Sequence, residues 1–387
     1  MRKRQKIFSD HRPFSKARRS RVWPYAMLAL VIGAIVLLAW VMSAFVFPFF
    51  GRVFRGEQQA FPSPTPEEQQ VGDLTDHIRE VLLTNQFRYV SKPALIGDEI
   101  FFASGADNAL NPALVNIYRS TAATSNSEVP KKVEGITAQN DNILSVAVSA
   151  DFIVYFDAKE TGGGTIMAFN RSDSTVTPLK TVLYGVVNVY LEGQWAFWME
   201  RTAWDTYKLY MMNVKNRELT TLAVYTDSPM GLSEPGVCDA EIVFVEADPD
   251  RANSEQYNHI VRQSLTTGEK TTFDPGMYAF NPVTNGTALA WSDHFGAADS
   301  TLYLSVDGSM PRKMAENVSE YGLGQNFLAW CENGQIWAYY YKDDALYRIS
   351  KPAEYAQLET VSDHGMAWRD VTDEKRERDI LKFAGLD

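Results

Sequence analysis

The residue best suited to acid–base chemistry in this sequence is a histidine in a short polar segment. His294 follows Asp293, and a neighbouring carboxylate can orient an imidazole so that it works as a general base. No nucleophile can be assigned to it from the spacing, so a loop residue without a catalytic role is the simpler interpretation. His364 stands beside Asp363 in a similar setting and is interpreted in the same way.

A second candidate for chemistry is a group of oxygen-bearing side chains that resembles a calcium-binding loop. Asp248 and Asp250 are followed by Asn253 and Glu255, all of which could offer oxygen ligands. The fifth position of the loop is Ala252, and the sixth position is not the glycine that such a loop requires. A solvated acidic loop is therefore the better interpretation. Histidines and cysteines also lack the spacing of a zinc site, so we expect no metal and no other cofactor.

Nucleophilic catalysis is not predicted either. A serine hydrolase of the α/β type carries its nucleophile in a Gly-x-Ser-x-Gly turn, and the sequence contains no such turn. The nearest approach is the segment 231–235, in which Pro235 replaces the second glycine. We therefore expect no catalytic residues and predict a protein that binds a partner without transforming it.

Binding is predicted instead at polar loops that carry carboxylates and one large aromatic residue. Trp204 lies between Ala203 and Asp205, and a tryptophan in so polar a segment is a candidate platform for a sugar or a protein. Packing of Trp204 onto a neighbouring element is the alternative. The predicted binding residues are Trp204, Asp205, Asp250, Asp293, His294 and Glu332.

These residues must be positioned by a repeated unit, because a six-residue pattern occurs seven times in the sequence. Each copy begins with a small or polar residue and ends on an aromatic, and successive copies start about 44 residues apart. The copies are Gly97–Phe102, Ala150–Tyr155, Gly193–Trp198, Asp239–Phe244, Gly286–Trp291, Gln325–Trp330 and Asp363–Trp368. Repeats of this length with several short strands are typical of β-propeller blades. Seven blades are favoured, and six are the alternative if the last copy belongs to a closing strand.

A second apolar strand follows most copies after a polar loop, as in Lys208–Val214 and Thr301–Val306. Together with the turn and the aromatic-ending strand, this pattern resembles the propeller repeats of TolB-like proteins and of the N-terminal domain of dipeptidyl peptidases. The resemblance covers about residues 87–387, although the fuller Ser-Pro-Asp-Gly turn of the family occurs in no copy. It implies an all-β propeller that serves as a binding platform, an assembly factor or an enzyme appendage, in this case without a hydrolase domain.

The N-terminal region contains the strongest membrane signal in the sequence. Residues 22–51 contain no Asp, Glu, Lys or Arg, and a stretch of this length can cross a bilayer as one helix. The preceding residues 1–21 contain nine Lys or Arg and a single Asp, which predicts a cytoplasmic tail and an external C-terminal portion. A cleaved signal peptide is the alternative, but its apolar core would be shorter, roughly 7–15 residues.

Three further segments are predicted after this span. Residues 52–72 are rich in proline and polar residues and form an extended linker. Residues 73–85 space their apolar side chains along one helical face, which predicts a short amphipathic helix. Residues 86–387 form the propeller domain, and its ring is closed by a late strand near residues 379–386 together with residues 87–90.

Charge limits the partners of the external portion. The tail contributes +8 and Arg52 and Arg55 add +2, so the remainder of this −11 chain carries −21. Such a domain repels nucleic acid and favours a basic protein or a neutral glycan as its ligand.

The predicted function is a non-catalytic binding or scaffold module, held in the cell envelope by the single span. Two alternatives remain: an enzyme that acts on a glycan or peptide at the propeller mouth, and a sensor that signals through a membrane partner. A domain of this size with two cysteines favours a bacterial envelope over a eukaryotic cell surface. We therefore expect a single-pass protein of the bacterial cell membrane, with its C-terminal domain extracellular or periplasmic.

Overall fold

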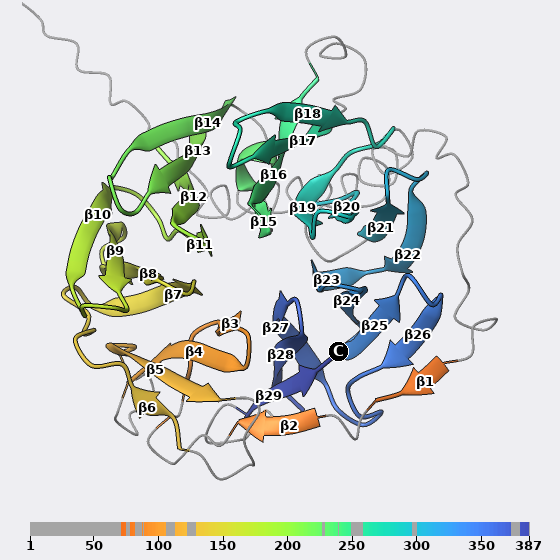
Figure 1. Cartoon of the computed structure of the whole chain (residues 1–387), viewed down its shortest axis with the longest axis horizontal. Helices are drawn as coiled ribbons and strands as arrows, with labels where there is room; N and C mark the ends of the chain where they lie inside the picture. Colours follow the sequence, from red (N-terminus) through yellow and green to blue (C-terminus); the bar gives the residue numbers. More distant parts are fainter. Residues whose placement is uncertain are drawn as a thin grey trace, which may run out of the picture. The chain divides into compact units, whose positions relative to one another are not determined.

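Seven β-sheets arranged in a ring make up the described part of the chain (Figure 1). The computed structural model describes residues 71–74, 78–81, 87, 89–105, 113–121, 129–226, 229–238, 240–248, 258–295, 300–372 and 380–386. The predicted tail, the predicted membrane span and most of the predicted linker lie outside these ranges. Within them, no helix has the length and apolar character that crossing a bilayer requires.

In each sheet, four strands lie side by side from the centre of the ring outward, and we number the sheets as blades 1 to 7 in the order of their innermost strands. The innermost strands, whose labels surround the centre in Figure 1, are β3 (Ala94–Ile96), β7 (Asn142–Val148), β11 (Val189–Glu192), β15 (Gly236–Cys238), β19 (Phe280–Thr284), β23 (Val318–Leu323) and β27 (Ala356–Ser362). The second strands are β4 (Glu99–Ser104), β8 (Phe152–Ala158), β12 (Trp195–Arg201), β16 (Glu241–Ala247), β20 (Ala288–Ser292), β24 (Phe327–Glu332) and β28 (Gly365–Asp370).

The outer half of each blade completes the sheet. The third strands are β5 (Asn116–Thr121), β9 (Gly164–Asn170), β13 (Thr206–Asn213), β17 (Asn258–Ser264), β21 (Thr301–Val306), β25 (Gln335–Tyr340) and β29 (Ile380–Gly385). The fourth strands are β6 (Lys131–Lys132), β10 (Val176–Val182), β14 (Leu219–Thr226), β18 (Lys270–Phe273), β22 (Arg312–Glu316), β26 (Ala345–Arg348) and, in blade 7, β2 (Ile78–Val81). A short 3-10 helix, η3 (Pro229–Leu232), connects blades 3 and 4.

The seven copies of the repeat form the second strand of every blade, which confirms an all-β propeller with seven blades. The aromatic residue that ends each copy is buried, and Trp198, Trp291 and Trp368 are among the largest fully buried side chains. Trp198 lies in one apolar cluster with Val154 and Phe156 of blade 2, so it packs between two blades. Burial of such a side chain contributes roughly 1.5–3 kcal/mol, and the repeat supplies one in each blade.

The N-terminal end of the described region closes the ring. Strand β2 pairs antiparallel with β29, with Ile78 opposite Ala384, and so becomes the outermost strand of blade 7. Strand β1 (Val71–Asp73) pairs parallel with β26 and adds a fifth strand to blade 6. Figure 1 shows these two strands beside the last strands of the chain. Two separate strands from the same segment therefore join the two final blades.

Two expectations about this segment are wrong. The sequence predicts a helix over residues 73–85, but residues 78–81 form strand β2, and they supply the closing strand in place of residues 87–90. The apolar spacing suits one face of a helix, but the free edge of β29 offers backbone hydrogen bonds that outweigh this local preference. Leu74 and Ile78 still pack their side chains against the core of blades 6 and 7. The expected late strand is confirmed as β29.

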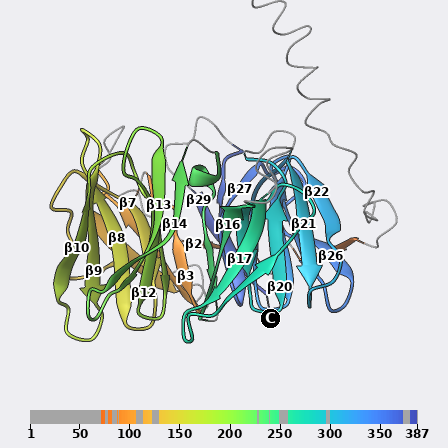
Figure 2. The same ribbon diagram turned by 90° about the horizontal axis from the view of Figure 1, so that it is seen from above.

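The propeller has two faces that carry different connections. At one face, the second strand of each blade turns into the third, and the fourth strand leads to the next blade; we call this the connection face. The opposite face carries the turns from the first strand to the second and from the third to the fourth, and we call it the turn face. Tight turns there place Gly193, Gly286 and Asp307 at positive φ. Figure 2 shows the strands running between the two faces.

Candidate functional site

A ring of polar residues lies on the innermost segments of the propeller, one residue from each blade. Six of them stand five residues before the start of a repeat, and the seventh, in blade 7, stands four residues before it. The beginnings of the innermost strands pair with the ends of the second strands, which places these residues toward the connection face. We call this set the polar ring; it consists of Lys92, Ser145, Asn188, Glu234, Asn281, Glu320 and Glu359.

Hydrogen bonds join neighbouring blades at the polar ring. The Val189 N–H donates to Ser145 Oγ over 3.0 Å, which links blade 3 to blade 2. The Asn188 side chain donates to the carboxylate of Glu234, which links blade 3 to the start of blade 4. The Glu234 N–H in turn donates to Asn281 Oδ1 over 2.9 Å, which links it to blade 5. The positions in this part of the ring are therefore fixed by contacts between adjacent blades.

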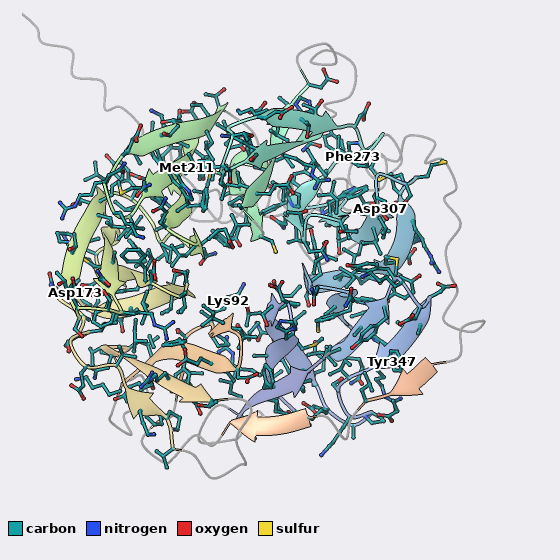
Figure 3. All side chains as sticks on the ribbon, in the orientation of Figure 1. Lys92, Asp173, Met211, Phe273, Asp307 and Tyr347 are labelled. Atoms are coloured by element: carbon teal, nitrogen blue, oxygen red, sulfur yellow. The ribbon has the colours of Figure 1, made fainter. Side chains whose placement is uncertain are left out.

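The charge of one lysine and of two other glutamates of the polar ring acts on Glu320. Glu320 in blade 6 senses the charges of Lys92, Glu234 and Glu359, which belong to other blades around the ring. Glu320 keeps solvent-exposed surface, but the surrounding protein removes part of the hydration of its carboxyl and so raises its pKa; the Lys92 charge lowers this pKa, and the two other glutamates raise it further. Figure 3 shows Lys92 next to the centre of the propeller. Lys92 and Glu234 stand two blades away from Glu320 on either side, and such groups come near one another only close to the axis.

The three glutamates differ in how their charge is balanced. Glu359 is buried and accepts a hydrogen bond from Arg369 Nε at 2.5 Å. Glu234 accepts hydrogen bonds from neutral donors, including the Tyr190 hydroxyl, and burial and then the Glu234 charge raise the pKa of this tyrosine. Glu320 is exposed, and no described residue forms a hydrogen bond or an ion pair with its side chain. Glu320 is thus the one of the three glutamates whose side chain makes no direct polar contact with a described residue.

Comparison with known proteins supports the fold. No protein-family model and no curated protein sequence matches the chain. The β-propeller domain of the trilobed protease from Pyrococcus furiosus is similar, with a TM-score of 0.56 at 12% identity over 77% of this chain and 93% of that domain. That propeller has an open velcro topology, whereas β2 closes the ring in this chain.

Two further structures are similar over most of the propeller. Acylaminoacyl peptidase from Pyrococcus horikoshii aligns with a TM-score of 0.51 at 10% identity over 74% of this chain. The alignment covers 49% of that peptidase, so this chain spans about half of its length. TolB from Acinetobacter baumannii aligns with a TM-score of 0.42 at 12% identity, over 78% of this chain and 64% of TolB. The resemblance to the propellers of peptidases is confirmed as a likeness of fold.

The acids that follow the repeat are tied into the fold. In six blades an acid stands two residues after the aromatic that ends the repeat, and none of these six acids is fully exposed. Side chains two residues apart on a strand share a face, so the acid is directed to the same side as the buried aromatic. We call them the second-strand acids: Asp157, Glu200, Glu246, Asp293, Glu332 and Asp370.

Two second-strand acids connect neighbouring blades. Asp157 is buried and accepts hydrogen bonds from the N–H groups of Gln139 and Asn140, at 2.7 and 3.1 Å. These residues belong to the connection from blade 1 to blade 2, so the carboxylate fixes this connection. Glu200 is buried and lies 2.9 Å from Lys180 Nζ, which forms an ion pair between blades 3 and 2.

A third second-strand acid belongs to a buried charged group in blade 7. Lys382 Nζ lies 2.9 Å from Asp370 Oδ2 and 3.1 Å from Glu354 Oε1. The indole N–H of Trp368 donates to the same Glu354 oxygen over 2.9 Å. Burial opposes the charge of the amine, but the hydrogen bonds with Asp370 and Glu354 raise the pKa of Lys382 above its ordinary value. This group stabilises blade 7 and is not placed to meet a ligand.

The predicted residues Asp293 and His294 also take part in local structure. The Ser292 hydroxyl donates to the backbone carbonyl of His294 over 2.7 Å, so this hydroxyl is not directed to the imidazole as a nucleophile would be. Asp293 is half-buried and accepts the Thr301 N–H over 2.7 Å. Burial raises the pKa of Asp293, and the hydrogen bonds from Thr301 partly offset this effect. His294 itself is exposed on the connection face.

Glu332 contributes less to a site than the sequence suggests. Glu332 ends β24 at a two-residue turn in which Asn333 and Gly334 have φ of 52° and 73°. Such a turn leaves no loop at this blade, and burial raises the pKa of the Glu332 carboxyl. Asp250 lies outside the described residues.

Trp204 and Asp205 lie at the tip of the β12–β13 hairpin, on the connection face. Trp204 is 88% exposed, so the alternative in which it packs onto a neighbouring element does not hold. Asp205 is also exposed and accepts a hydrogen bond from the Thr206 hydroxyl over 3.2 Å. The structure thus leaves an aromatic and a carboxylate open to a partner.

The candidate site offers carboxylates, amides and one lysine, which can form ion pairs and hydrogen bonds with a ligand. Among the residues that the structure describes, no group of three or more His, Cys, Asp or Glu side chains is placed to hold a metal ion. Sequence reasoning missed the polar ring, because its members lie outside the repeat. A signal was nevertheless present, since the polar residues recur at a nearly constant distance before each copy.

Proposed function

We propose that this protein is a non-catalytic binding or scaffold module of the cell envelope, and that its connection face binds a basic protein. In this proposal residues 22–51 anchor the chain in the cell membrane with the N-terminus in the cytoplasm. The propeller is displayed outside, beyond the linker 52–72, and the envelope is bacterial. Its role is to hold a partner at the membrane surface.

The observation that supports this proposal is the unbalanced charge of the polar ring. The ring contains three glutamates and one lysine, and the Glu320 side chain is exposed with no ion-pair partner among the described residues. A carboxylate that is held near other carboxylates interacts more favourably with an approaching cation than an isolated one does. A lysine or arginine side chain of a partner supplies such a cation.

A pair of peptides tests the proposal. One labelled peptide alternates lysine with glycine and the other alternates glutamate with glycine, and fluorescence anisotropy measures their binding to the purified full-length chain. We expect only the lysine peptide to bind, with an affinity that falls as salt shortens a Debye length of about 8–10 Å. Binding that does not depend on salt would contradict an electrostatic site.

Two matched double variants separate a specific site from general attraction to an acidic protein. The first variant carries Glu234→Gln and Glu320→Gln in the polar ring. The control carries Asp98→Asn and Asp307→Asn, which remove two exposed carboxylates from the turn face. We expect the first to weaken binding by about tenfold and the control by less than about twofold. Equal losses in both would exclude the polar ring as the site.

The membrane topology is tested separately. Protease added to intact cells should digest the propeller domain and leave the tail of residues 1–21 protected, because the bilayer shields a cytoplasmic segment. Protection of the propeller domain, with loss of the tail, would reverse the proposed orientation.

A second candidate function is an enzyme that acts on a glycan, and one observation favours it. The raised pKa of Glu320 beside Glu234 and Glu359 resembles sites in which one carboxyl keeps its proton as a general acid while another stays ionised. Hydrolysis of aryl glycosides that is lost in Glu320→Gln would favour the enzyme. Peptide binding without any turnover would favour the binding module.

A further inference from the structure

Large exposed apolar side chains gather on the connection face around blades 2 to 4. The β10–β11 loop carries Leu183, Tyr184 and Val186, which are 68%, 54% and 59% exposed. Trp204 lies on the β12–β13 hairpin, and Leu232 at the end of η3 is 44% exposed. We call these five residues the apolar rim. Exposed apolar groups of this size are costly in water unless another surface covers them.

Contacts between their supporting segments keep the residues of the apolar rim together. Lys180 Nζ lies 2.9 Å from Glu200 Oε2, which ties the end of β10 to the end of β12. The ion pair therefore joins the two strands close to the points where the β10–β11 loop and the Trp204 hairpin begin. Gly231 of η3 packs so closely on the Tyr207 ring of β13 that an added Cβ would lie 2.7 Å from it. The helix η3, which carries Leu232, therefore adjoins the hairpin that carries Trp204.

The Trp204 hairpin is held in a fixed shape. Arg201 Nε donates to the Ala203 carbonyl over 3.1 Å, and the same guanidinium donates to the Trp204 carbonyl over 2.5 Å. The guanidinium carbon also lies 5.0 Å from the centroid of the indole ring. The Thr202 N–H closes the hairpin by donating to the Thr206 carbonyl over 2.8 Å. A preorganised tryptophan loses little entropy on binding, and tryptophan often dominates the energy of protein interfaces.

Negative charge borders the apolar rim. The Asn188 side chain, at the end of the β10–β11 loop, donates to the carboxylate of Glu234, which stands two residues after Leu232. Glu234 belongs to the polar ring, so the apolar rim and the polar ring meet at this residue. Asp205 next to Trp204 adds a second exposed carboxylate. A ligand that covers the rim therefore meets carboxylates at its edge.

We propose that the apolar rim is the docking site for a basic amphipathic segment of a partner protein. Apolar side chains of this segment cover Trp204 and the β10–β11 loop, and its lysine or arginine side chains reach the carboxylates of the polar ring. The inference rests on the proposed function and specifies the chemistry of the partner. Two copies of so acidic a face would repel each other, and an anionic bilayer surface would be repelled as well.

Selection from a peptide library tests the chemistry of the partner. Random twelve-residue peptides are displayed and selected against the purified full-length chain, and enriched sequences are synthesised with a fluorescent label. We expect enrichment of peptides that combine Leu, Phe or Trp with Lys or Arg, because both surfaces then contribute. Enrichment of acidic or wholly polar peptides would overturn the inference.

A pair of exposed-residue variants tests the place of docking. Trp204→Ala removes the anchor of the rim, and the control Met310→Ala removes an apolar side chain that is 75% exposed on the turn face. We expect Trp204→Ala to raise the Kd of the selected peptides by about tenfold, or about 1.4 kcal/mol, and the control to change it by less than about twofold. An unchanged Kd in Trp204→Ala would exclude the rim. Val186→Ser, a second change in the rim, should also weaken binding.

Failure of this inference can be distinguished from failure of the proposed function. Binding that depends on Glu320 but not on Trp204 would keep the polar ring as the site and remove the rim. Binding that depends on Trp204 but neither on salt nor on Glu320 would remove the electrostatic site and show that the partner need not be basic. Self-association that Trp204→Ala abolishes, measured by light scattering, would assign the rim to a second copy of the chain and overturn the inference.

Discussion

Carboxylates occur in two settings in this propeller, among the strands of the blades and near the axis. Among the strands, Glu200 is paired with Lys180 of the neighbouring blade, and Asp370 is paired with Lys382 of its own blade. At the axis, Glu320 is exposed and has no direct ion-pair partner among the described residues. Both sets lie toward the connection face, and both contribute to the acidity that the sequence displays. The presence or absence of a cation partner at each carboxylate, and not the number of acids, therefore indicates which acids are available to a binding partner.

The largest effect is expected at the buried charged group of blade 7. Lys382→Ala leaves buried Glu354 and half-buried Asp370 without their cation, so it should destabilise the protein by about 3–5 kcal/mol. Urea unfolding followed by circular dichroism measures this loss. The control is Lys132→Ala on the exposed strand β6, which should change the free energy of unfolding by less than about 0.5 kcal/mol. A loss below about 1 kcal/mol in Lys382→Ala would mean that the group does not support the fold.

A smaller loss is expected at the ion pair between blades 2 and 3. Lys180→Ala should cost about 1–3 kcal/mol, because buried Glu200 loses its cation but keeps a hydrogen bond from the Trp198 indole. Water can also reach the place of Lys180, whose side chain is partly exposed. The same urea experiment measures the difference between the two lysines. Equal losses for Lys180→Ala and Lys382→Ala would show that burial does not separate these two groups.

At the axis the sign of the effect should reverse. The pKa of Glu320 is raised above its ordinary value of 4.5, so the folded protein binds this proton more tightly than the unfolded chain does. Stability therefore falls as the pH rises from 4.5 through the folded pKa, and Glu320→Gln removes this loss. We expect the variant to melt at a higher temperature than the unchanged protein at pH 7, and the difference to vanish below about pH 4. Calorimetry over this range measures it, and a variant that melts lower at pH 7 would contradict the comparison.

The smallest effect on stability is expected at the apolar rim. Trp204→Ala removes a side chain that is 88% exposed and packs little apolar surface, so the free energy of unfolding should change by less than about 0.5 kcal/mol. Urea unfolding of this variant beside Lys382→Ala tests the separation between binding residues and structural residues. A loss above about 2 kcal/mol would show that Trp204 supports the fold after all.

Local patterns in the sequence were enough to predict the blades. The aromatic of each repeat and the strand that carries it are neighbours along the chain, so their period reveals the second strand of every blade. The structural role of the second-strand acids was also open to prediction, because an acid two residues after a buried aromatic shares its face. The sequence-based interpretation instead assigned Asp293 and Glu332 to a binding surface, while the structure ties Asp293 to Thr301.

Features that depend on distant segments could not be predicted in this way. The spacing within residues 73–85 predicts a helix, but residues 78–81 form a strand on the edge of β29. This edge lies at the other end of the described chain, so a local pattern cannot reveal it. The polar ring likewise forms only when segments of all blades meet around one axis. The sequence allows Trp204 either to be exposed or to pack on a neighbouring blade. Only the arrangement of the blades shows that it is exposed.

The closing strands have a consequence for the order of events during synthesis. Strands β1 and β2 emerge from the ribosome before any blade, yet their partners β26 and β29 are among the last described strands to be made. Asp73 and Arg348 form an ion pair across 275 residues of sequence. In the meantime these strands and their future partners expose unpaired edges, which attract other chains. We therefore expect nascent chains of this protein to need a chaperone until β29 has been synthesised and the ring can close.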